Sequence, residues 1–138
     1  YAIAVGMADG LGLGANARAA LVTRALAEMR RLAEKMGAKD ATLMGLTGIG
    51  DLILTCSDNQ SRNRRFGLYL GQGLSIQAAL EKVEQVVEGY EAVKQAIVLS
   101  ERAGVSMPIL DQVHQVLYHG QGVKVALDAL MTRSVGQE

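Results

Sequence analysis

Hydrophobic side chains recur along most of the chain at the three- and four-residue spacing that is typical of amphipathic helices. In the segment after Asn16 the charged residues avoid the apolar face, and Arg24 and Glu28 have the i,i+4 spacing of a surface ion pair. We predict a long helix here, with Asn16 as its N-cap and Gly37 at its C-terminal end. Its apolar face consists of Leu21, Val22, Ala25, Leu26, Met29, Leu32, Ala33 and Met36.

The rest of the chain predicts shorter helices. Glycines interrupt the stretch from Ala41 to Cys56, so we expect two short helices that meet at Gly48–Gly50. The other predicted helices are one from Ser61 to Gly71 or Gly73, one capped by Ser75, one over residues 87–103 that ends at Gly104, one with Pro108 in its first turn, and one over 123–131.

The opening run YAIAVGMA has no helical periodicity, and we interpret it as a short extended segment. No other strand is predicted, and neither an internal repeat nor a linker divides the chain. The predicted fold class is therefore all-α: one multi-helix domain over residues 1–138, entered through a short extended N-terminal segment.

Composition narrows the possible functions. The 14 basic and 14 acidic residues balance, which argues against a nucleic-acid surface. Hydrophobic residues make up 49% of the chain, yet no apolar run approaches the roughly 18 residues of a membrane span. A single cysteine, Cys56, fits a reducing compartment, so we expect a cytoplasmic protein. Because the chain opens on Tyr1 instead of an initiator Met, we expect it to be a piece of a longer polypeptide.

Glycines near the start match the G-x-G-x-x-A pattern of a dinucleotide-binding loop at Gly10, Gly12 and Ala15. That loop requires a strand directly before the first glycine and a second strand that ends in an acidic residue about 20 positions later. Here the corresponding region is the middle of an amphipathic helix. We conclude that these glycines let the chain pass close to neighbouring helices.

An anion site is predicted at the start of the helix after Ser61. Free backbone N–H groups and the positive end of the helix dipole favour an anion there, and Arg62 adds a planar guanidinium that can bind a phosphate or carboxylate. On this helix Arg62 and Arg65 share a face, while Arg64 points away. The alternative is a solvated basic helix start without a ligand.

Other polar residues give weaker signals. Asp51 is either a helix N-cap or a carboxylate on a cleft wall that orients a cation or a substrate hydroxyl. His114 and His119 are five residues apart, which does not match the spacing of two metal ligands on one helix face, so we predict no metal site. Cys56 has no histidine nearby and is interpreted as a small buried side chain.

Taken together, these motifs resemble one family, the bacterial NAD(P)-dependent glycerol-3-phosphate dehydrogenases. The resemblance extends over nearly the whole chain but corresponds only to the C-terminal helical substrate domain of that family, whose N-terminal Rossmann domain would lie upstream of Tyr1. The matching stretches are DGLGLGANARAALVTR (9–24), MGLTGIGDLILTC (44–56), NQSRNRRFGLYLGQG (59–73), QVVEGYEAV (85–93) and MPILDQVHQVLYHG (107–120).

The resemblance implies a role for individual residues. Asp51 matches an aspartate in the substrate site near the catalytic lysine, which should lie a few residues before Tyr1. The stretch of Ser61, Arg62 and Asn63 matches a motif that binds glycerol 3-phosphate, in which the arginine contacts the phosphate and also reaches the cofactor.

Three further positions follow from the same resemblance. Val86 and Glu88 match positions that touch the nicotinamide cofactor, and Thr55 matches a site position in related eukaryotic enzymes. Because the lysine is upstream, we expect this chain alone to be inactive.

The implied reaction is the interconversion of dihydroxyacetone phosphate and sn-glycerol 3-phosphate for glycerophospholipid synthesis. NAD or NADP would be bound mainly by the Rossmann domain, and the resemblance also implies a homodimer. Two alternatives remain open at this point. One is a related two-domain dehydrogenase acting on another hydroxy acid, and the other is a non-catalytic helical module that binds a phosphorylated metabolite or a protein partner.

Overall fold

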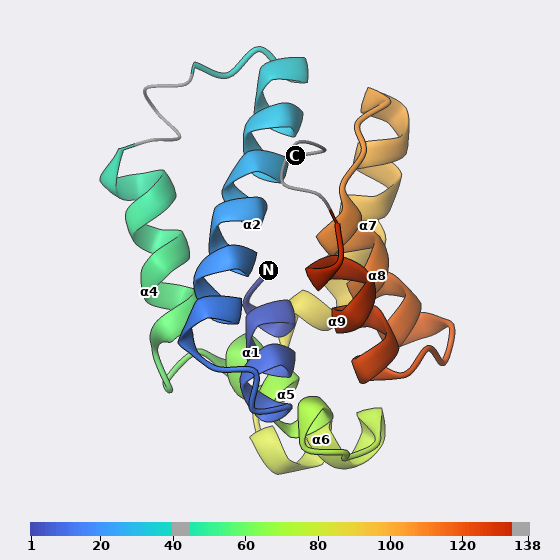
Figure 1. Cartoon of the computed structure of the whole chain (residues 1–138). Helices are drawn as coiled ribbons and strands as arrows, with labels where there is room; N and C mark the ends of the chain where they lie inside the picture. The colour runs from blue at the N-terminus through green and yellow to red at the C-terminus, as the bar shows by residue number, and fades with distance from the viewer. Residues whose placement is uncertain (40–44, 134–138) are drawn as a thin grey trace.

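The computed structural model describes residues 1–39 and 45–133, and every regular element in these two ranges is helical (Figure 1). The all-α prediction is therefore confirmed for this part of the chain. None of its helices is both long enough and apolar enough to cross a membrane. The elements are α1 (Ala2–Gly10), α2 (Ala15–Lys35), the π-helix η1 (Leu46–Gly50), α4 (Asp51–Ser57), α5 (Arg62–Gly71), α6 (Ile76–Val83), α7 (Glu88–Ala103), α8 (Pro108–Tyr118) and α9 (Val123–Met131).

The long helix α2 contacts helices on both of its sides. It packs against α4 on one side and against α7 and α8 on the other, while α1 lies beside its N-terminal half (Figure 1). The core between these helices is continuous. Its largest fully buried side chains include Met7, Leu21, Phe66, Ile109, Leu127 and Leu130.

The prediction of an extended opening segment is wrong, because residues 2–10 form the helix α1. All residues from Ala2 to Ala8 are buried, so the helix is covered on every side. A helix that is buried all round carries no polar face and therefore no 3.6-residue periodicity. A short apolar run of this kind cannot be distinguished from a buried strand by its pattern alone.

Four glycines bring α1 and α5 into backbone contact. They are spaced four residues apart on each helix: Gly6 and Gly10 on α1, and Gly67 and Gly71 on α5. A Cβ atom at Gly10 would lie 2.8 Å from the Cα of Gly71, and one at Gly6 would lie 2.8 Å from the backbone nitrogen of Leu68. The interpretation of the opening glycines as residues of close approach is therefore confirmed for Gly10 but wrong for Gly12, where an added Cβ would meet nothing within 4 Å. Gly12 has a φ of +74° in the turn that leads to α2 and serves a different purpose.

Two details of α2 differ from the prediction. Its N-cap is Gly14 without a side-chain cap, so Asn16 lies inside the first turn. Arg24 and Glu28 are buried and do not form the surface pair that their spacing suggested. Arg24 donates instead to the carbonyl oxygen of Leu130, in the last turn of α9, and to that of Arg133, which follows this helix. These hydrogen bonds offset the cost of burying the polar guanidinium group of Arg24.

Most predicted helix ends are confirmed. Ser75 caps α6 through its Oγ, which accepts from the backbone N–H of Ala78 at 3.1 Å. Gly104 ends α7 in the left-handed conformation, and Pro108 begins α8. The two short helices expected around Gly48–Gly50 are η1 and α4, which follow one another directly, and the start of that stretch (residues 41–44) lies outside the described residues.

Candidate functional site

A polar cavity of about 300 Å³ lies where the end of α4, the start of α5 and the loop before α7 meet. Segments that are distant in the sequence thus contribute to one site. The lining brings together all of the substrate and cofactor residues that the family resemblance implied, with Asp51 as the exception. The lining residues are Leu54, Thr55, Asp58, Gln60, Ser61, Arg62, Asn63, Val86 and Glu88.

The N-terminus of α5 forms one wall of this cavity. Ser61 is the N-cap, and its Oγ accepts from the backbone N–H of Arg64 at 3.2 Å. Arg62 and Asn63 occupy the first turn, where backbone N–H groups have no acceptor within the helix. Arg62 is exposed and lines the cavity. A guanidinium beside a helix N-terminus is a favourable arrangement for a phosphate.

Arg64 points away from the cavity, as predicted, and has a structural role. Its Nη2 lies 2.8 Å from Oδ2 of Asp9 on α1, and each of these side chains is only 8% exposed. Its Nη1 donates to Oδ1 of Asn59 at 2.6 Å. The second carboxylate oxygen of Asp9 accepts from Arg18 of α2. This network holds the loop before α5 against α1, and the sequence pattern contained no signal for it.

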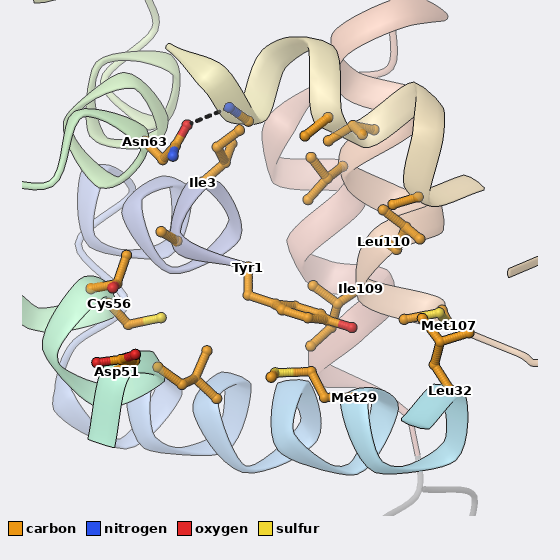
Figure 2. Close-up of a pocket in the computed structure, with 18 of the residues that line it drawn as sticks. Tyr1, Ile3, Met29, Leu32, Asp51, Cys56, Asn63, Met107, Ile109 and Leu110 are labelled. Carbon is orange, nitrogen blue, oxygen red and sulfur yellow. Dashed lines mark hydrogen bonds between the residues drawn. The ribbon is translucent and has the colours of Figure 1, made fainter. Parts of the chain in front are cut away.

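A second, larger cavity of about 620 Å³ adjoins the first and is mostly apolar. Asp51 and Asn63 lie toward one end of it, whereas Leu32 and Met107 lie toward the other (Figure 2). Thr55 and Asn63 line both cavities. The two cavities therefore share a polar wall.

The structure excludes one of the two interpretations of Asp51. The N-cap of α4 is Gly50, and Asp51 is the first helical residue without a capping hydrogen bond from its side chain. The N-cap alternative is therefore wrong. The carboxylate of Asp51 is instead part of the lining of the larger cavity, next to the π-helix η1.

Gly89 was not anticipated as a site residue, yet it contacts Asn63 directly. Its backbone N–H donates to Oδ1 of Asn63 at 2.9 Å, which links the start of α7 to the start of α5 (Figure 2). Only its position beside Glu88 could have suggested it from sequence.

Glu28 and Tyr1 form a second unanticipated pair. Tyr1 lies in the larger cavity (Figure 2). Its hydroxyl donates to Oε2 of Glu28 at 3.2 Å. The other carboxylate oxygen accepts from the backbone N–H of Ile109 at 2.6 Å, at the start of α8. Burial raises the pKa of Glu28 from its ordinary value of 4.5 to about 7, although these hydrogen bonds oppose the shift.

Three residues that the sequence did not assign to the site remain: Cys56, which is part of the lining of the larger cavity, and His114 and His119, which line neither cavity. Cys56 is buried, as predicted, and burial raises the pKa of its thiol, so it stays protonated at neutral pH. His119 follows the last residue of α8, as the sequence suggested. Among residues 1–39 and 45–133, no three His, Cys, Asp or Glu side chains gather closely enough to hold a metal ion.

The family model described as NAD-dependent glycerol-3-phosphate dehydrogenase C-terminus matches residues 1–128. The chain belongs to this family. A glycerol-3-phosphate dehydrogenase [NAD(P)+] of Vibrio parahaemolyticus is 58% identical over 132 residues, which are 96% of this chain and 38% of the relative. The enzyme of the same name from Shigella boydii is 56% identical over 133 residues, which are 96% of this chain and 39% of the relative.

A solved structure of the family agrees with the fold. The crystal structure of glycerol-3-phosphate dehydrogenase from Coxiella burnetii matches with a TM-score of 0.93 at 48% identity, over 96% of this chain and 41% of that one. The resemblance to the glycerol-3-phosphate dehydrogenases is thus confirmed. The chain spans about two fifths of the length of the relatives it matches.

Proposed function

We propose that this chain is the substrate domain of an NAD(P)-dependent sn-glycerol-3-phosphate dehydrogenase, which interconverts dihydroxyacetone phosphate and sn-glycerol 3-phosphate for glycerophospholipid synthesis. The observation that carries the proposal is the polar cavity whose lining includes Ser61, Arg62 and Asn63, the residues that form the N-terminus of α5. We propose that residues 1–138 act as one domain and that a Rossmann domain precedes it in the complete enzyme.

The phosphate of the substrate would bind to Arg62 and to the first backbone N–H groups of α5. Two parallel hydrogen bonds from a guanidinium fix both the position and the orientation of a phosphate. Ser61 supports this site indirectly, because it caps the N–H of Arg64 and so fixes where the helix begins. Binding energy from the phosphate, which does not react, is then available to orient the ketone.

The reacting end of the substrate would face Asn63 and Asp51, which line the adjoining cavity. Asn63 can donate to a substrate oxygen from its amide N–H₂ group. The resemblance places a proton-donating lysine shortly before Tyr1, and Tyr1 lies in the cavity that Asp51 lines. Asp51 would orient the lysine ammonium and keep it protonated until the developing alkoxide takes the proton.

Val86, Glu88 and Arg62 would contact the cofactor. They line one cavity, where Val86 is 72% exposed and offers an apolar surface beside the Arg62 cation. An apolar face next to a cation fits the nicotinamide end of a dinucleotide, whose remaining part would be held by the Rossmann domain. When bound, the cofactor supplies a hydride to the ketone carbon. NAD and NADP are both compatible with these three residues.

We further propose that the enzyme is a homodimer in the cytoplasm. The dimer follows from the family resemblance, and the compartment follows from the single reduced cysteine, which is buried.

The test is the oxidation of reduced nicotinamide by dihydroxyacetone phosphate in the complete enzyme, measured for the wild type and for Arg62→Ala. Loss of a charged hydrogen bond to the phosphate should raise KM about 10- to 100-fold and lower kcat. Arg102→Ala is the matched control, because Arg102 is exposed near the end of α7 and lines neither cavity. Wild-type kinetics in Arg62→Ala would remove Arg62 from the site. A wild type inactive with both cofactors would favour a non-catalytic module that binds a phosphorylated metabolite.

A further inference from the structure

We propose that Gly89 is a positioning residue of the substrate site, which fixes the side-chain amide of Asn63 with its N–H₂ end available to the substrate. This inference rests on the proposed function and extends it to a residue for which neither the sequence motifs nor the family resemblance implied a role.

The hydrogen bond itself defines the orientation of the amide. A backbone N–H can only donate, so the atom of Asn63 that faces it at 2.9 Å is the carbonyl oxygen. Figure 2 shows this oxygen directed at the start of α7. The amide nitrogen therefore points elsewhere, with two hydrogens to donate. With the opposite orientation Asn63 would present an oxygen lone pair to the substrate, which an oxyanion or a phosphate would repel.

The absence of a side chain at residue 89 is required for this contact. A Cβ atom there would lie 2.5 Å from Oδ1 and 3.0 Å from Cγ of Asn63, and 3.1 Å from Cδ1 of Ile3. The backbone does not need glycine, because Gly89 is helical and has no positive φ. Glycine is among the poorest helix formers, so its place in the first turn of α7 is explained by the approach of Asn63.

The same contact joins two parts of the site. Glu88 precedes Gly89 at the start of α7 and lines the polar cavity, whereas Asn63 lines both cavities. The bond from Gly89 therefore sets the distance between the residues proposed to touch the cofactor and those proposed to hold the substrate.

The first experiment compares Gly89→Ala with the wild type in the complete enzyme. We expect KM for dihydroxyacetone phosphate to rise about 10- to 100-fold, because the displaced amide no longer donates to the substrate. The matched control is Gly122→Ala, where the added Cβ would meet only a methyl carbon of Val125 at 3.9 Å. This control should keep the wild-type KM. Wild-type KM in Gly89→Ala would overturn the proposal.

A double-mutant cycle shows whether Gly89 acts through Asn63. Asn63→Ala removes both Cγ and Oδ1, the two nearest atoms to the added methyl group, so Gly89→Ala should change KM by less than about 2-fold in that background. A full additional loss in the double variant would mean that residue 89 acts through other contacts, and would overturn the proposal.

Asn63→Asp covers the case in which Gly89→Ala fails to fold. An aspartate carboxylate still accepts from the Gly89 N–H but has no hydrogen to donate, so the variant should melt at the wild-type temperature and bind substrate poorly. Wild-type KM in Asn63→Asp would contradict the donor role. The same variants are compared for their affinity for dihydroxyacetone phosphate by calorimetry, because this ligand carries the oxygen that Asn63 is proposed to contact. A wild type that binds dihydroxyacetone phosphate but does not turn it over would refute the proposed reaction, while the affinities of the variants would still test Gly89.

Discussion

Replacing Gly67 with alanine tests whether α1 and α5 depend on backbone contact. Gly67 lies inside α5, where a methyl group would overlap the carbonyl oxygen of Ile3 and lie 2.9 Å from its carbonyl carbon and 3.0 Å from its Cα. All three atoms belong to the backbone of α1. The clash can therefore be relieved only by moving one helix away from the other.

Two opposing contributions determine how much Gly67→Ala changes the free energy of unfolding. In an open helix interior, changing glycine to alanine stabilises by about 1 kcal/mol. Overpacking a core costs about 1–3 kcal/mol, and we take the upper end because backbone atoms cannot rotate away as a side chain can. The net loss for Gly67→Ala is then about 2 kcal/mol, which corresponds to a fall in Tm of roughly 8 °C for a chain of this size.

The assay is urea unfolding of the 138-residue chain, followed by circular dichroism, together with a thermal melt. Gly122→Ala serves as the reference, because its methyl group meets nothing closer than 3.9 Å. Gly122 is the N-cap of α9, where alanine is less favourable than glycine, so this variant should lower stability by less than about 1 kcal/mol. If Gly67→Ala is as stable as the wild type or more stable, helix propensity has outweighed the contact. The account of the α1–α5 crossing would then be refuted.

Three further predictions concern buried charge and helix capping. Because burial raises the pKa of Glu28 from 4.5 to about 7, the folded state binds this proton more tightly than the unfolded chain, and stability should fall as pH rises from about 4.5 to about 7. Glu28→Gln removes the charge: its amide oxygen can still accept from the Ile109 N–H, while its N–H₂ group can donate to the Tyr1 oxygen and so reverse that hydrogen bond. This variant should flatten the decline, and a decline of unchanged slope in urea midpoints from pH 5 to pH 8 would contradict the assignment. Asp9→Asn should cost about 3 kcal/mol of unfolding free energy, because it leaves the Arg64 guanidinium buried without its countercharge. Breaking the exposed Lys124–Asp128 pair by Lys124→Ala should cost less than about 1 kcal/mol, and equal losses for the two variants would refute the distinction. Ser75→Ala should remove the cap of α6 and lower stability by about 1 kcal/mol in the same urea assay, and an unchanged midpoint would show that the cap contributes nothing.

The helices that could be predicted from the sequence are those with a polar face and a marked end. α2 and α8 have both. Ser61 and Ser75 mark the starts of α5 and α6, and Gly104 marks the end of α7, because capping depends only on residues close in the sequence. α1 could not be predicted, because burial on every side removes the periodicity on which helix assignment depends. The buried charges of Arg24 and Glu28 were missed because i,i+4 spacing does not reveal what packs over a helix.

The part of the candidate site that consists of consecutive residues could be predicted from the sequence. Ser61, Arg62 and Asn63 are adjacent in the sequence and adjacent in the cavity, and the resemblance added Val86 and Glu88. Contacts between distant segments left no local pattern. The bond from Gly89 to Asn63 spans 26 positions, and the ion pair between Arg64 and Asp9 spans 55. Such contacts become visible only once the fold brings the segments together. The roles of the site residues in substrate and cofactor binding stay predictions.

The crossing of α1 and α5 also has a mechanical consequence. Where helices meet through side chains, a small shift of one helix can be absorbed by changes of rotamer before the other helix moves. At Gly6, Gly10, Gly67 and Gly71 there are no side-chain torsions to absorb it, and the backbones are in direct contact. A displacement of α1 is therefore passed to α5 with little loss. Arg62 and Asn63 are the first residues of α5 and line the polar cavity. A force that displaces α1 therefore also moves these two residues.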